Sequence, residues 1–242
     1  MVPDPYAWSW NPEALLVIPL LSLGYAVAVR RFPSPAWRIA AFAAAMLLLL
    51  GVTITPVETI GVNYLLTVHL IQNVVLAEWA PALAVLGIPP ALAALAPRVP
   101  PIPALLLWLV NYGVWHLPWI YDAALRNPHT LLHLEHALYF VTGVLLWWPI
   151  VHGDHSPGFK AGYLFAAFAL ASPIGLLLAL IPETIYDFYV DAPERLWGLS
   201  PLADQQLAGG TMALEQAAVF FAVFALYVAR FFREQDALDE AA

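Results

Sequence analysis

Histidine residues recur inside the most apolar parts of this 242-residue chain. His129, His133 and His136 are spaced i, i+4 and i+7, so a helix would present all three imidazoles on one face. His69 and Asn73 stand four residues apart and would share a face in the same way. Ionisable side chains in apolar helices usually face a bundle interior or a wet cavity. The spacing therefore predicts polar faces that meet inside the protein.

Methionine and carboxylate side chains add candidate ligands to these imidazoles. Met212 and Glu215 are spaced i, i+3 and fall on one helix face. Imidazole nitrogen with thioether sulfur favours copper, especially Cu(I), whereas imidazole with carboxylate also suits zinc or iron. Histidines on two helices could instead hold a haem. The alternative is that the histidines only hydrogen-bond between helices.

The composition requires lipid around most of the chain. Hydrophobic residues make up 62% of the sequence and charged residues only 11%, too few to cover a soluble domain. Uncharged stretches repeatedly approach or exceed the length of about 20 residues that crosses a bilayer. We predict an all-α polytopic membrane bundle, a single domain over residues 1–242. About seven transmembrane helices are expected, at 13–30, 37–56, 61–86, 103–120, 130–151, 161–182 and 207–230.

The basic residues predict the orientation of the bundle. Seven of the nine Lys and Arg residues fall on one side of these spans, which should be cytoplasmic. The N-terminus is then outside and the C-terminus cytoplasmic, in a bacterial plasma (inner) membrane. In this orientation His69 lies about 12 Å into the third span, and the polar faces of the fifth and seventh spans reach similar depths. We predict a metal site near the outer face.

The predicted ligands come from three spans. Three are imidazoles and the fourth is a softer sulfur ligand: His69, His133, His136 and Met212. A further set is placed to support the site or admit an ion: Asn73, His116, Glu135, Asp204 and Glu215. No enzyme is expected, because the chain has no cysteine and lacks the GxSxG, HExxH and phosphate-loop motifs.

Three segments resemble the CtaG family of cytochrome c oxidase assembly factors. The first is TVHLIQN at 67–73. The second contains WHLP at 115–118, YDAAL at 121–125, HLEH at 133–136 and LWWP at 146–149. The third is DQQLAGGTM at 204–212. Together they cover most of residues 60–215.

The resemblance implies a role in maturing haem–copper terminal oxidases by helping to supply copper. Subunits of such an oxidase and the lipid bilayer would be the partners, and no nucleic acid is expected. The polar positions of the family fall here on His69, His133, Glu135, His136, Asp204 and Met212. This chain departs from the family by carrying Asn73 where a second histidine is common, and asparagine is a poor ligand for soft copper. Glu78 also stands where an apolar residue is expected.

Four functions follow from these observations. The first is an oxidase assembly factor that handles transient copper. The second is a copper or solute transporter, which requires a polar path across the whole membrane. The third is a haem-binding membrane oxidoreductase, and the fourth is a metal-free scaffold whose histidines only join helices.

Overall fold

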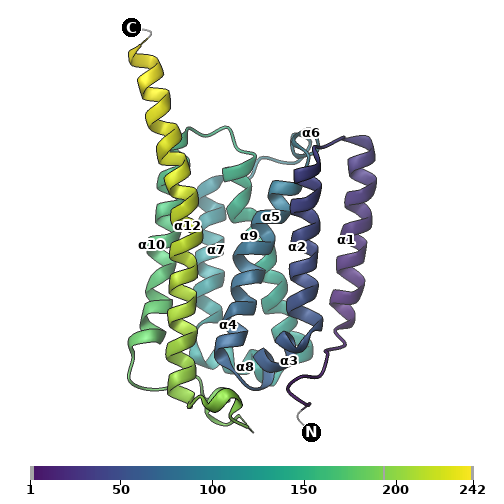
Figure 1. The fold of residues 1–242 in the computed structure, drawn as a ribbon, viewed down its shortest axis with the longest axis vertical. Coiled ribbons are helices and arrows are strands. Elements are labelled where there is room, and N and C mark those ends of the chain that lie inside the picture. Colours follow the sequence, from purple (N-terminus) through teal and green to yellow (C-terminus); the bar gives the residue numbers. More distant parts are fainter. Residues whose placement is uncertain (1–2, 193, 241–242) are drawn as a thin grey trace.

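A computed structural model describes residues 3–192 and 194–240, and the regular elements within these ranges are helices. In these ranges six helical segments are long and apolar enough to cross a membrane. They are α1 (Pro12–Arg31), α2 (Ala36–Ile54), the run Leu66–Gly87, the run Pro128–Val151, α10 (Pro157–Leu180) and α12 (Pro201–Asp239). The shorter apolar helix α7 (Pro101–Trp115) lies among them (Figure 1). The two ends of the chain lie at opposite ends of this bundle, as an odd number of crossings requires (Figure 1). The expected all-helical membrane bundle is confirmed.

Helix α7 is shorter than the span expected at 103–120. It ends at Trp115, and Leu117 is extended with ψ near 126° before α8 (Pro118–Arg126) begins. A residue that precedes proline avoids the helical region, because the proline ring clashes with it. Pro118 therefore ends the fourth span early and turns the chain into a separate helix.

The expected third span is a broken helix. Its parts are α3 (Pro56–Asn63), α4 (Leu66–Val74), the π-helical turn η1 (Val75–Trp79) and α5 (Ala80–Gly87). Pro81 has no backbone N–H, so the α-helical hydrogen bond to the carbonyl of Ala77 cannot form. Gly143 of α9 (His133–Val151) packs there, and a Cβ on it would collide with that carbonyl oxygen. The missing donor and the close neighbour together explain the irregular turn.

Helix α12 extends beyond the expected span on both sides. It begins after Ser200, whose hydroxyl accepts a hydrogen bond from the N–H of Ala203 at 3.2 Å. Its far end projects from the bundle in Figure 1 and is exposed from Ala229 to Glu240. The acidic residues of this end cannot lie in hydrocarbon, so the helix continues into water.

Close backbone contact joins α10 to α12. A Cβ on Gly209 would lie 2.5 Å from the nitrogen of Ala179 and 2.6 Å from the oxygen of Gly175. Small residues of this kind let membrane helices approach closely. Helix α1 is the opposite case, because it packs mainly on α2 at the edge of the bundle and leaves most of its apolar surface to lipid (Figure 1).

Short elements complete the chain between the long helices. They are α6 (Pro90–Ala93), the π-helical turn η2 (Pro128–Leu132), α11 (Asp187–Val190) and η3 (Leu196–Gly198). α3 and α8 lie at the end of the bundle that holds the N-terminus (Figure 1). With the predicted orientation, this is the outer end.

Candidate functional site

The imidazole of His69 is fully buried on α4, and its hydrogen bonds define its tautomer. Its Nδ1 lies 2.7 Å from the hydroxyl oxygen of Tyr189, which itself donates to the carbonyl of Gly61 at 2.7 Å. The Tyr189 hydroxyl has a single proton, and when it is donated to that carbonyl, Nδ1 of His69 is the donor in its contact with Tyr189. A neutral imidazole protonated at Nδ1 carries a free lone pair on Nε2.

His116, at the end of α7, is held in the same tautomer. Its Nδ1 lies 2.8 Å from the backbone oxygen of Tyr112. A carbonyl oxygen only accepts, so Nδ1 carries the proton and Nε2 again has a free lone pair. Ligating histidines usually donate their other N–H to a carbonyl or carboxylate in this way, which fixes the ring and raises its basicity.

His136 of α9 brings a third imidazole to the same region. Its ring centroid lies 6.1 Å from that of His69, at an interplanar angle of 80°. The Nε2 atoms of His69, His116 and His136 are all buried without a hydrogen-bond partner among the described residues. As they stand, no three His, Asp or Glu side chains in residues 3–192 and 194–240 form a group that could hold a metal ion. The structure thus brings three bare nitrogen atoms into one region without closing a coordination sphere.

Tyrosines surround these imidazoles, and sequence reasoning missed them. Tyr121 lies 3.1 Å from His69 through its hydroxyl, and Tyr186 donates to the backbone oxygen of His116 at 3.1 Å. Tyr121, Tyr186 and Tyr189 are all buried, so they belong to the interior of the bundle. Tyr186 and Tyr189 are spaced i, i+3 in the outer loop, and that spacing was the available signal.

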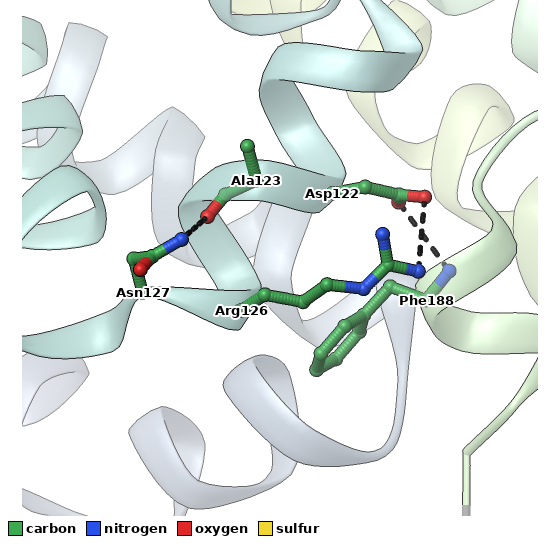
Figure 2. A network of polar contacts seen from close by, with 5 residues as sticks. All are labelled: Asp122, Ala123, Arg126, Asn127 and Phe188. Carbon is green, nitrogen blue, oxygen red and sulfur yellow. Dashed lines mark hydrogen bonds and ion pairs between the residues drawn. The ribbon is translucent and has the colours of Figure 1, made fainter.

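An acidic side chain, Asp122, joins α8 to the outer loop (Figure 2). Asp122 of α8 accepts a hydrogen bond from the backbone N–H of Phe188 at 3.3 Å and lies 3.6 Å from the guanidinium of Arg126. Burial raises the pKa of Asp122, while the contacts with Phe188 and Arg126 oppose this rise. Phe188 directly precedes Tyr189, so this contact helps to place the hydroxyl that orients His69.

The carboxylate of Asp204 is engaged in hydrogen bonds within the protein and is not open to an incoming ion. Its Oδ2 accepts from the N–H of Leu66 at 2.8 Å, and its Oδ1 accepts from the N–H of Thr67 at 3.0 Å. The Thr67 hydroxyl donates to the same carboxylate at 2.7 Å. A carboxylate at a helix N-terminus satisfies free N–H groups and complements the helix dipole. Asp204 of α12 therefore caps α4, the helix that carries His69.

The other predicted site residues make contacts of their own with other side chains. His133 is partly exposed, and its Nδ1 faces Glu13 of α1 at 3.6 Å. Met212 accepts a hydrogen bond at its sulfur from the Tyr112 hydroxyl at 3.1 Å. Asn73 donates to Glu135 Oε1 at 3.2 Å across α4 and α9, while Asn73 Oδ1 and Glu135 Oε2 are buried without a partner among the described residues. Glu215 of α12 accepts a hydrogen bond from the Trp79 indole, deeper in the bundle.

The comparison with protein families identifies the chain. Residues 23–234 match the family model described as the cytochrome c oxidase caa3 assembly factor, Caa3_CtaG. The chain belongs to the Caa3_CtaG family. The expected resemblance is confirmed, and it includes every helix that contributes to the imidazole cluster. No curated protein and no solved structure matches the chain.

Proposed function

We propose that this cytochrome c oxidase assembly factor hands copper to a haem–copper oxidase at the outer face of a bacterial inner membrane. The imidazoles of His69, His116 and His136 would hold the ion as transient cargo. The observation that carries the proposal is that three buried Nε2 atoms, from three helices, lack a hydrogen-bond partner among the described residues. Buried polar atoms in native proteins are rarely left unpaired without a reason.

The hydrogen bonds of the cluster support a metal rather than a purely structural role. A histidine that only joins helices would use both ring nitrogens on protein partners. Here Nδ1 of His69 and of His116 contacts an oxygen atom of the protein, while Nε2 of each ring has no hydrogen-bond partner among the described residues. Neutral imidazole is a good ligand for copper, and binding would require the rings to move toward one another.

This ligand set differs from the set predicted from sequence. His116 takes the place of His133, because the latter faces Glu13 at the edge of the bundle. Met212 is left out of this set, because its sulfur accepts a hydrogen bond from the Tyr112 hydroxyl. A site with few ligands fits delivery, since cargo held by a complete coordination sphere would leave slowly.

Copper binding by the purified protein tests the ligand assignment. We expect about one Cu(I) per chain in wild type and a large loss in the double variant His69→Ala/His116→Ala. His155→Ala is the matched control, because this histidine lies outside the cluster in a loop after α9. Equal copper in wild type and the double variant would refute the assignment.

Oxidase maturation tests the biological role. The variant genes would be expressed in a strain that lacks its own family member, and oxidase activity and oxidase copper content would be measured. The double variant should leave the oxidase copper-poor, and added copper should restore part of the activity. Full activity without copper binding would instead indicate a metal-free scaffold.

A further inference from the structure

A second cluster of buried polar side chains lies deeper in the bundle. Glu78 and Glu215 lie on facing segments, η1 and α12, and crossed hydrogen bonds hold their carboxyl groups side by side. Gln216 donates from its amide to Glu78 Oε1 at 2.9 Å, and the Trp79 indole donates to Glu215 Oε1. The Oε2 atoms of both carboxyl groups are buried and receive no hydrogen bond from any described N–H or O–H group.

Within residues 3–192 and 194–240, no basic side chain forms an ion pair with these two carboxyl groups. The ion pairs among the described residues are Arg126 with Asp122 and His133 with Glu13. The groups that contact the pair are Gln216 and Trp79, and the titratable group facing it from α7 is Tyr112, which Gln216 contacts at 2.9 Å. Two carboxylates this close cannot both stay ionised in an apolar site, as in the paired carboxyl groups of aspartic proteases.

The position of the pair makes two negative charges there especially unfavourable. Glu78 has no exposed surface and lies about 18 Å along the helix from Leu66, near the middle of a hydrocarbon core of about 30 Å. It sits in the π-helical turn before Pro81, and such turns are often found at functional sites. Glu215 is only half-buried, so one side of the pair borders the lipid.

We propose that Glu78 and Glu215 form a proton-binding site in the middle of the membrane, where the two carboxyl groups share a single proton. The proton lies between the two Oε2 atoms, and its bond to one carboxyl and hydrogen bond to the other satisfy both. The remaining single negative charge is stabilised by the N–H groups of Gln216 and Trp79. This site is separate from the imidazole cluster and does not depend on copper.

Infrared spectroscopy of the protein in lipid measures how many protons the two carboxyl groups hold. Protonated carboxyl groups absorb separately from carboxylates, so the band lost on replacing both residues gives the number of protons held. We expect Glu78→Gln/Glu215→Gln to remove the intensity of one protonated carboxyl at neutral pH. Glu58→Gln, measured at low pH, supplies the intensity of a single carboxyl for calibration.

Two results would overturn the proposal. A loss equal to two carboxyl groups would show two independent neutral acids. No loss would show two carboxylates, and elemental analysis would then reveal whether a metal ion balances them.

Chemical labelling of wild type provides a second measurement that needs no folded variant. A hydrophobic carbodiimide reaches carboxyl groups from the lipid and adds to protonated ones. Peptide mapping should find one adduct per chain, on Glu215 or on Glu78. Glu183→Gln, an exposed loop position, should keep this adduct, and no adduct on either glutamate of the pair would contradict the proposal.

Discussion

The imidazole cluster and the Glu78–Glu215 pair lie about 14 Å apart along the same broken helix, yet their unpaired atoms differ in kind. In the cluster, the fixed tautomers of His69 and His116 leave neutral rings with free lone pairs. In the pair, two acidic groups face each other with too few donors. A neutral imidazole can be buried without a bound cation. A pair of carboxylates must instead bind a proton or another cation before it can be buried.

The contact between Glu58 and Gln72 is intermediate between these two regions, because it contains one buried carboxyl group instead of two. Gln72 donates from its amide to Glu58 and to the backbone oxygen of Val52, as Gln216 donates to Glu78. This outer contact contains a single carboxyl, so it separates the effect of burial from the effect of pairing.

Removing the cap on α4 should damage both regions together. Asp204→Ala would leave the N–H groups of Leu66 and Thr67 and the Thr67 hydroxyl without their acceptor, at a cost of about 4 kcal/mol. Thermal unfolding in detergent measures this loss, and copper binding should fall with it. Asp204→Asn keeps one acceptor oxygen and should lose less. An unchanged unfolding midpoint for Asp204→Ala would show that the cap does not support α4.

Stability should depend on pH through the single carboxyl of Glu58. Burial raises its pKa from 4.5 to about 7, although the Gln72 amide opposes the rise. The folded state therefore binds this proton more tightly than the unfolded state. Its contribution is complete below pH 4.5 and is lost as pH rises through about 7.

The expected size of this pH effect is roughly 3 kcal/mol. Unfolding midpoints measured at pH 5 and pH 8 on wild type and Glu58→Gln would test it, since the variant lacks the titrating group. The difference between the two pH values should shrink in the variant. If both proteins respond equally to pH, another group is responsible.

Crowding the π-helical turn should affect the deep region alone. A Cβ on Gly143 would collide with the Ala77 carbonyl and lie 2.6 Å from Pro81 Cγ, whereas a Cβ on Gly113 would meet no atom within 4 Å. We expect Gly143→Ala to cost about 2 kcal/mol and to shift the carboxyl band of the pair. Gly113→Ala serves as the matched control. Loss of copper binding in Gly143→Ala would show that the two regions are not independent.

Removing one hydroxyl should weaken the cluster without unfolding it. Tyr189→Phe deletes the oxygen that accepts from Nδ1 of His69, and we expect Cu(I) affinity to fall about tenfold. Tyr25→Phe is the control, because its hydroxyl donates to Gly87 at the other end of the bundle. Competition with a chelator of known affinity measures both variants. Equal affinities would mean that Tyr189 does not orient the ligand.

Much of the fold could be predicted from the order of apolar stretches, but the breaks within them were harder to place. Pro118 ends α7 early by a local steric rule that the sequence already displays. The π-helical turn before Pro81 also depends on Gly143, which lies far away in the chain. The first effect is local and could have been foreseen, whereas the second needs the packing of α9.

The membrane bundle, the family and the set of polar residues that lipid would not tolerate could all be read from the sequence, because hydrophobicity and helical spacing are properties of local sequence. Which of these residues meet depends on the packing of the helices. It turned His133 toward Glu13, joined His69, His116 and His136 in one region, made Asp204 a helix cap, and placed Glu78 against Glu215. The reason is physical: spacing fixes the face of one helix, but the partner of that face depends on how all the helices rotate and pack together.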